Sequence, residues 1–262
     1  MTDAGSHPLT YTGYYDAERR PVRGVVPVEK SLVIYVNSEP LVSLACTPTH
    51  IEELALGFLF NEGLIEGLDE IEAVDLCDQE LRVDVWLHHD IETPQLRTIT
   101  SGCSGGATFE DMSSLHHRVR SSLCVTPPQV TQLMEEFEQA SALYRRAGGV
   151  HGAALAEVGA VSTPLLCLAE DIGRHNALDK IAGICLRQGY STGGCVLLTS
   201  GRISSEMVNK TVRMGVPIAI SRTSPTSLSV QLAQEWGVTL IGYTRRHSFR
   251  VYTGAERVVA PK

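Results

Sequence analysis

Three junctions between an apolar run and a helical pattern constrain the fold of this chain most. They occupy residues 170–176, 200–206 and 221–226, and an amphipathic helical pattern follows each one. Alternating strands and helices predict a largely parallel sheet with helices on both faces. If the three apolar runs are neighbouring strands, their carboxyl ends converge on one crevice, where ligands of open α/β sheets bind.

Each junction contains an arginine, namely Arg174, Arg202 and Arg222. Helix-start N–H groups attract anions, and guanidinium forks suit phosphates. The alternative is that each arginine pairs with an unrelated carboxylate such as Asp171 or Glu206. Arginines at three equivalent junctions favour a site for a phosphorylated ligand.

Two further basic groups lie near these junctions. The turn at residues 243–248 follows the apolar run 239–241 and adds positive charge to the same region. His151 lies at a helix-to-strand turn and is compatible with either a structural hydrogen bond or a role in the site.

The periodicity divides the chain into three parts. Residues 1–20 are polar and are expected to form a flexible N-terminal arm. Residues 21–125 are expected to form a small α+β domain, with a hairpin within 32–46, a helix at 49–61, strands at 71–76 and 81–87, and a small-residue loop at 98–107. Residues 126–262 are expected to form an α/β domain that opens with a helix. Its later elements are strands at 152–158, 164–169, 195–199, 216–221, 238–243 and 249–253 and helices at 176–188, 204–214 and 226–236, the first two strands being antiparallel.

Composition narrows the class of protein. The net charge of −8 argues against broad nucleic-acid binding. No apolar run approaches the ~20 residues of a membrane span, and the first residues lack a signal-peptide pattern. We therefore expect a cytoplasmic protein without a nucleic-acid or membrane partner.

The seven cysteines include one candidate functional thiol, Cys103. It lies between serine and glycine in the loop at 98–107, where an exposed thiol is a liability unless it is used. The alternative is a plain flexible linker. Five other cysteines sit in apolar patterns and are expected to be buried: Cys46, Cys77, Cys167, Cys185 and Cys195.

The order of elements in the last domain matches the cytidine-deaminase-like fold, a three-layer α/β domain with a mixed sheet. Members of that fold bind zinc through thiols and a histidine at two of these junctions. Here neither junction holds a thiol, and His175 alone does not suffice. We therefore expect no tightly held metal, and a hydrolase of nucleotide-like substrates becomes the least favoured hypothesis.

Long sequence strings resemble the formate dehydrogenase accessory sulfurtransferase family, FdhD. They are GGVHGAAL at 148–155, EDIGRHNALDKIAG at 170–183, the run from LLTSGRISSEMVNK to HSFRVYT at 197–253, and the earlier LALGFLFNEG at 54–63. The resemblance implies that a cysteine desulfurase passes persulfide sulfur to Cys103. The protein would then transfer it to the molybdenum or tungsten bis-guanine-dinucleotide cofactor, a bound substrate, before insertion into the formate dehydrogenase catalytic subunit.

The resemblance also implies a homodimer and a cofactor-binding segment at 243–248. Many relatives carry C-x-x-C in the loop, whereas this chain has one thiol there; a lone thiolate can still accept and pass on a persulfide. A non-catalytic chaperone of the cofactor is the alternative function. The expected cofactor-binding residues are Tyr243, Thr244, Arg245, Arg246, His247, Ser248, Arg174, His175, Arg202 and Arg222.

Overall fold

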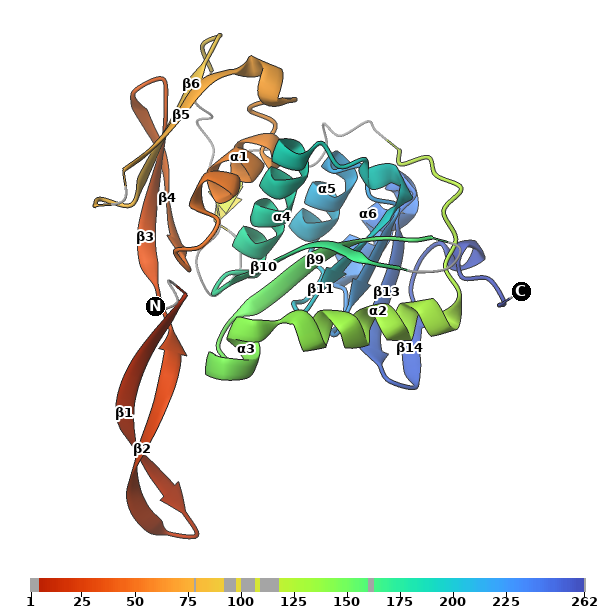
Figure 1. Cartoon of the computed structure of the whole chain (residues 1–262). Helices are drawn as coiled ribbons and strands as arrows, with labels where there is room; N and C mark the ends of the chain where they lie inside the picture. Colours follow the sequence, from red (N-terminus) through yellow and green to blue (C-terminus); the bar gives the residue numbers. More distant parts are fainter. Residues whose placement is uncertain are drawn as a thin grey trace.

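A computed structural model describes residues 5–77, 79–91, 98–99, 107–108, 118–159 and 163–261. A projecting hairpin, a small sheet with one helix and a larger sheet with helices on both faces follow one another along the chain (Figure 1). None of the helices in these residues combines the length and apolarity needed to cross a membrane.

The first part is a β-hairpin of β1 (Ser6–Tyr15) and β2 (Glu18–Pro27). Asp16 and Ala17 form the turn with φ values of 50° and 70°, which is the two-residue geometry that matches the twist of paired strands. The flexible arm expected over residues 1–20 is therefore replaced, from residue 6 onward, by regular strands. The boundary expected after residue 20 falls inside β2.

The small sheet has the strand order β4-β3-β6-β5. Its strands are β3 (Lys30–Val36), β4 (Glu39–Cys46), β5 (Ile71–Cys77) and β6 (Arg82–Leu87), and the 3-10 turn η1 (Leu68–Glu70) precedes β5. Helix α1 (Ile51–Asn61) packs on one face. Alternate residues such as Ile34, Val83 and Val85 are fully buried under α1, as the period of two predicts. Two short strands, β7 (Thr98–Ile99) and β8 (Ala107–Thr108), pair with each other.

The larger sheet has the order β10-β9-β11-β12-β13-β14. Its strands are β9 (His151–Glu157), β10 (Leu165–Asp171), β11 (Cys195–Thr199), β12 (Ile218–Ser221), β13 (Thr239–Arg245) and β14 (Ser248–Val251). Strand β9 is antiparallel to both β10 and β11, and β11, β12 and β13 run parallel. The mixed sheet is confirmed, but it is less parallel than the strand-helix alternation suggested, because β14 is antiparallel as well.

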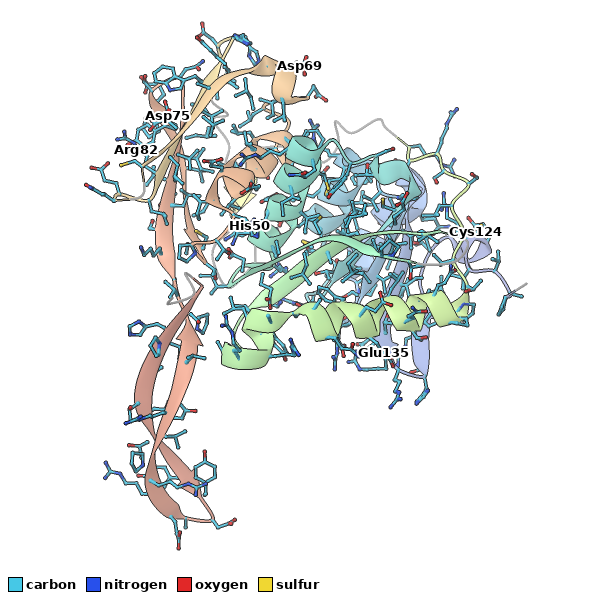
Figure 2. All side chains as sticks on the ribbon, viewed as in Figure 1. His50, Asp69, Asp75, Arg82, Cys124 and Glu135 are labelled. Atoms are coloured by element: carbon cyan, nitrogen blue, oxygen red, sulfur yellow. The ribbon has the colours of Figure 1, made fainter. Side chains whose placement is uncertain are left out.

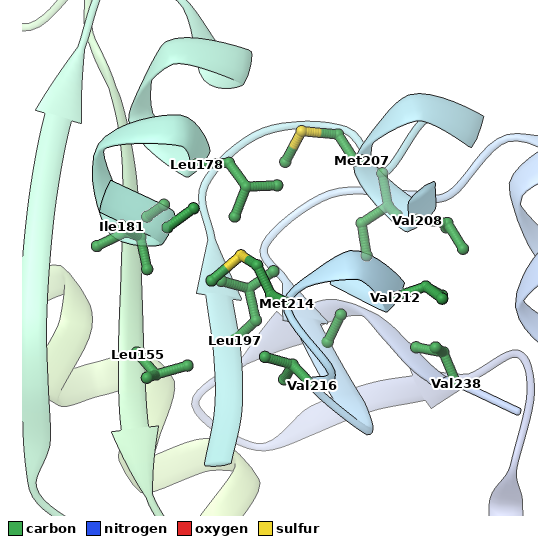
Figure 3. Packing of buried hydrophobic residues seen from close by; sticks show 14 of the residues in the cluster. Leu155, Leu178, Ile181, Leu197, Met207, Val208, Val212, Met214, Val216 and Val238 are labelled. Carbon is green, nitrogen blue, oxygen red and sulfur yellow. The ribbon is translucent and has the colours of Figure 1, made fainter. Parts of the chain in front are cut away.

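Helices cover both faces of this sheet. Helix α2 (Pro127–Ala140) packs on one face, and α4 (Arg174–Gln188), α5 (Ser205–Arg213) and α6 (Ser227–Trp236) pack on the other. Figure 3 shows the core on the face that α4, α5 and α6 cover. Leu178 and Ile181 of α4, Met207 and Val208 of α5 and Leu197 of β11 belong to this buried cluster. The short α3 (Ala142–Ala147) and the 3-10 turns η2 (Thr192–Gly194) and η3 (Ala255–Arg257) complete the fold.

The opening helix begins and ends for local reasons. Gln129 Oε1 accepts a hydrogen bond from the backbone N–H of Thr126 at 2.9 Å, and Pro127 occupies the first turn, as the Thr-Pro-Pro pattern predicts. The helix that opens the last domain ends at Ala140, and Ser141 separates it from α3. The Ser141 hydroxyl donates to the Phe137 carbonyl at 2.8 Å, and that bond caps the first helix.

The two sheets are joined by the crossing of α1 and α4. A Cβ placed on Gly57 would lie 1.8 Å from the Asp179 carbonyl oxygen, and one on Gly183 would lie 1.9 Å from that of Glu53. The helix backbones therefore touch, and α1 bridges the small sheet and the layer of α4, α5 and α6 (Figure 1).

Candidate functional site

The carboxyl ends of β10, β11, β12 and β13 all lie at one edge of the larger sheet. Strand β10 shares this direction because β9 is antiparallel to both of its neighbours. The convergence expected from the sequence is therefore confirmed. The condition stated with it, that the three apolar runs are neighbouring strands, holds for β11 and β12 but not for β10, because β9 lies between β10 and β11.

The inserted strand brings His151 to this edge. Its Nδ1 lies 3.3 Å from the Ser200 hydroxyl, which accepts from the Gly152 backbone N–H at 3.0 Å. A Cβ on Gly201 would lie 3.0 Å from the Arg174 Cβ and 3.5 Å from His151 Nδ1, so glycine is needed for this close approach. The first and second junctions therefore meet around His151.

The pKa of His151 is lowered, first by burial and then by the charge of Arg174. Its imidazole is therefore neutral near pH 7, and it can exchange hydrogen bonds with a ligand without adding charge. The sequence left the role of His151 open. The register Asp171↔His151 brings it into the site.

His175 lies in the first turn of α4 and is almost fully buried. Its Nδ1 lies 3.1 Å from Glu206 Oε2 at the start of α5. Burial lowers the pKa of His175 to about 2, and the charges of Lys210 and Arg174 contribute. The neutral ring therefore donates its Nδ1–H to Glu206, and this bond ties the first junction to the second.

The three junction arginines have different surroundings. Arg174 is buried in the cluster around Gly201, and Arg202 is exposed. Arg222 forms an ion pair with Glu138 of α2. The carboxylate-pairing alternative therefore holds for Arg222, although its partner lies on α2 and is neither Asp171 nor Glu206.

The basic turn lies beside the third junction. The Tyr243 N–H donates to the Thr223 carbonyl at 2.9 Å, and Arg245 donates to the carbonyl of Arg222. Residues 243–245 belong to β13, so the turn itself is shorter than expected. The sheet bulges here, between Gly242 and Arg245, and Tyr243 takes a φ of 52°.

The side chains of this turn divide between solvent and core. Thr244 is fully buried, whereas Arg245, Arg246, His247 and Ser248 are exposed. Arg246 lies 3.5 Å from Glu135 of α2, a residue labelled in Figure 2. Three exposed basic side chains therefore stand next to Arg222.

A network of buried charges lies beneath the first junction. Lys180 Nζ lies 2.6 Å from Asp171 Oδ2 and donates to the Thr47 carbonyl at 2.9 Å. Asp171 also accepts from the backbone N–H groups of Thr47 and Gly173 and from the Asn176 amide. These bonds fix the end of β4 against the start of α4.

A second buried network links α1, α4 and α5. Lys210 donates to both Asp179 oxygens at 2.8 Å, and the Asn61 amide donates to Asp179 at 2.7 Å. Burial opposes the Lys210 charge, but Asp179 and Glu62 outweigh it, so the pKa of Lys210 is raised. None of these residues has a predicted role in the sequence alone. The sequence does contain a hint of this network, because Asp179 and Lys210 occupy helix positions whose neighbours on the same face are apolar and buried.

The cysteines are partly as expected. Cys46, Cys185 and Cys195 are buried, and burial raises the pKa of Cys46 to about 12. Cys77 and Cys167 are only half-buried, because they lie on the edge strands β5 and β10. Cys124 is exposed on the segment before α2 (Figure 2). Cys103 lies outside the described residues.

Comparison with known proteins identifies the family. The model of the FdhD/NarQ family matches residues 27–259. This chain belongs to the FdhD/NarQ family. The family suggested by the sequence strings is thereby confirmed, and the match begins where the β1–β2 hairpin ends.

Several FdhD/NarQ relatives are similar over nearly their whole length. Sulfur carrier protein FdhD of Listeria innocua is 38% identical over 245 residues, covering 90% of this chain and 92% of the relative. The protein of the same name from Bacillus subtilis is 38% identical over 252 residues, covering 94% of both. A crystal structure named as that of a formate dehydrogenase accessory protein from Desulfotalea psychrophila has a TM-score of 0.83 at 29% identity, covering 97% of this chain and all of the other.

Proposed function

We propose that this FdhD/NarQ protein is a cytoplasmic sulfur carrier for formate dehydrogenase. It would accept sulfur from a cysteine desulfurase on Cys103 and pass it to the molybdenum or tungsten bis-guanine-dinucleotide cofactor before insertion into the dehydrogenase catalytic subunit. The observation that carries the proposal is the 38% identity to proteins named sulfur carriers over nine-tenths of the chain.

The edge of the larger sheet supports a phosphorylated cargo. Exposed Arg202, Arg245 and Arg246 stand where the strands end, and helix α4 begins there. Such groups bind phosphate oxygens well. Arg222 already pairs with Glu138, so a phosphate there must compete with that carboxylate. His151 and Ser248 would supply hydrogen bonds, and Tyr243 would supply an aromatic ring face for stacking.

The proposed transfer needs a single thiol. The Cys103 thiolate attacks the terminal sulfur of a desulfurase persulfide, the S–S bond of that persulfide breaks, and the desulfurase thiolate leaves. Cys103 then carries the terminal sulfur as its own persulfide. Release of that sulfur to the cargo regenerates the Cys103 thiolate, so no second loop cysteine is required.

The test is the intact mass of the protein after incubation with a cysteine desulfurase and cysteine. We expect the wild type to gain one reducible sulfur, about 32 Da, and Cys103→Ala to gain none. Cys124→Ala is the matched control, because Cys124 is exposed in the structure and should not affect loading. Equal loading of Cys103→Ala and the wild type would refute the proposal.

The exposed basic groups also favour a second candidate, a non-catalytic chaperone that binds the cofactor without carrying sulfur. This alternative predicts that Cys103→Ala retains full dehydrogenase maturation, whereas the sulfur carrier predicts its loss. Titration with GDP reports on the shared part of both proposals. We expect Arg246→Gln to weaken GDP binding several-fold, because the charge of Arg246 is exposed beside Arg222.

A further inference from the structure

The outer face of the small sheet, which points away from α1, contains a cavity of about 440 Å³. It is lined mainly by Tyr35 of β3, Asp75 of β5 and Arg82, Asp84 and Trp86 of β6. The residues of β6 that alternate with these are buried under α1, so the period of two places the lining residues on the opposite side. Figure 2 labels Asp75 and Arg82 on this face.

The segment that forms β5 and β6 holds the negative charge of the whole chain. Residues 62–90 contain ten Asp and Glu but a single Lys or Arg, namely Arg82, and the net charge of the chain is −8. The remaining residues are therefore close to neutral. A strong field of one sign attracts partners of the opposite sign and repels those of its own sign. A ligand of the outer face is therefore expected to be cationic.

Two carboxylates of the outer face lie opposite each other across the strands. Asp75 of β5 is in register with Asp84 of β6, and like charges in such positions are unfavourable. Arg82 compensates Asp84, because its Nε lies 2.9 Å from Asp84 Oδ2. Asp75 is exposed, and no Lys or Arg of the described residues forms an ion pair with it. Asp75 is therefore open to a cation from another molecule.

Trp86 presents an aromatic ring beside this carboxylate. It is 37% exposed, and its neighbour across β5 is Ala73, whose small side chain leaves the ring open. Asp75 is the diagonal neighbour of Trp86, within reach of long side chains. A ring face next to a carboxylate attracts ammonium and guanidinium groups. The outer face already holds one such group, since the Arg82 guanidinium lies 5.3 Å from the centroid of the Tyr35 ring.

We propose that the outer face binds a Lys- or Arg-rich segment of a partner protein, with one cationic side chain in the cavity between Trp86 and Asp75. Exposed Glu72 and Glu80 lie near the two ends of β5, so the negative charge extends along the strand beyond the cavity. A ligand with several cations spaced along a chain therefore matches this face better than a single ammonium ion does. The binding does not depend on the proposed sulfur chemistry.

The first measurement locates the bound ligand. The full chain with Trp236→Phe retains Trp86 as its one tryptophan, and it is titrated with an oligo-arginine peptide at about 0.01 M salt, where exposed charges are screened least. The emission of Trp86 should change saturably as the peptide is added. Trp86→Phe is the matched variant, because it retains the buried Trp236 of α6, and its emission should stay constant.

The second measurement compares affinities through the fluorescence anisotropy of the labelled peptide. Asp75→Asn should weaken binding several-fold. Trp86→Leu should weaken it about two- to fivefold without any change of charge, because an exposed cation–π contact contributes that much. Glu256→Gln is the matched control, since it removes one exposed carboxylate from η3, and it should bind the peptide like the wild type.

The proposal is overturned if the emission of Trp86 does not respond to the peptide, or if Asp75→Asn binds it as tightly as Glu256→Gln does. Spermidine provides a further test, because it carries several cations without a peptide backbone. If spermidine binds as tightly as the peptide, the face takes small polyamines and not a protein segment. Circular dichroism checks the fold of each variant, and Asp75→Asn should be at least as stable as the wild type because it removes a repulsion.

Discussion

Arg222 pairs with Glu138 of α2, whereas Arg202, one junction away, is exposed. The sequence places both arginines at equivalent positions after a strand. Their roles differ because Glu138 of α2 lies within ion-pair distance of Arg222, which follows β12. The sequence pattern therefore predicts that each arginine lies at the end of a strand, but the residues around it in the fold determine whether it forms an ion pair or faces solvent.

The low pKa of His175 predicts how the stability of the protein depends on pH. Its folded pKa is about 2 against an ordinary 6.5, so between these values the unfolded chain binds a proton that the folded chain excludes. Stability should therefore rise with pH over this window and fall as the solution is acidified below pH 6.5. The slope from His175 alone should approach about 1.4 kcal/mol per pH unit.

The measurement is urea unfolding at several pH values between 7 and about 5, where carboxylates titrate little. His175→Gln keeps an N–H donor for Glu206 but does not titrate, so its stability should depend less steeply on pH than that of the wild type. Equal slopes in the two proteins would show that the pKa of His175 is not lowered by folding.

At the scale of elements, the hydrophobic period predicts the strands and helices well. The expected helix at 176–188 matches α4, and the expected strand at 195–199 matches β11. The order of the strands was not predictable in this way. The period shows that β9 is a buried strand but does not show that it lies between β10 and β11.

The close contact of Gly57 and Gly183 at the crossing of α1 and α4 predicts that a larger residue there destabilises the protein. Glycine inside a helix costs about 1 kcal/mol relative to alanine, so its presence needs a reason, and the touching backbones supply it. Gly57→Ala should separate the helices and destabilise the protein by roughly 1–3 kcal/mol or more. Thermal unfolding measures this loss.

Gly193→Ala is the control for that substitution. A Cβ on Gly193 meets nothing within 4 Å, so this variant should unfold at the wild-type temperature. If Gly57→Ala unfolds at the same temperature too, the close approach of α1 and α4 is not maintained in solution.

At the scale of the whole molecule, the two sheets share buried charges. Lys180 and Asp171 are completely buried, and Lys180 of α4 contacts both Thr47, which follows β4, and Glu170 and Asp171 at the end of β10. Separating the small sheet from the larger one would break the hydrogen bonds of Lys180 and Asp171 to Thr47. We therefore expect the two parts to unfold together, although the sequence divides them into separate domains.

The two tryptophans report on this coupling. Trp86 lies in β6 of the small sheet, and Trp236 ends α6 of the larger part. Urea unfolding of Trp86→Phe and Trp236→Phe, followed by the remaining tryptophan, should give coincident transitions. Lys180→Met should lower the free energy of unfolding measured by either tryptophan by about 3–5 kcal/mol, because it leaves the Asp171 carboxylate buried without its ion-pair partner.

An exposed ion pair provides the control. Arg187 of α4 lies 2.6 Å from Glu52 of α1 at the surface, and Arg187→Met should cost less than about 1 kcal/mol. Two separate transitions in the wild type would instead establish the domain division expected at residues 125 and 126.

The sequence by itself determined the elements, the family and the edge at which polar residues gather. Strand and helix periods arise from local backbone geometry, so they are visible in a single chain. The long strings at 148–155, 170–183 and 197–253 were sufficient to indicate the family, which the comparisons confirm.

Only the tertiary structure decided which residues meet at that edge and which charges are structural. His151 reaches the site because β9 is inserted between two strands, and Lys180 is buried because β4 packs on α4. The ordered hairpin at residues 6–27 also needed the structure, because polar strands with exposed faces carry a weak hydrophobic period. Long-range pairing depends on contacts between distant residues, and local patterns contain little information about it.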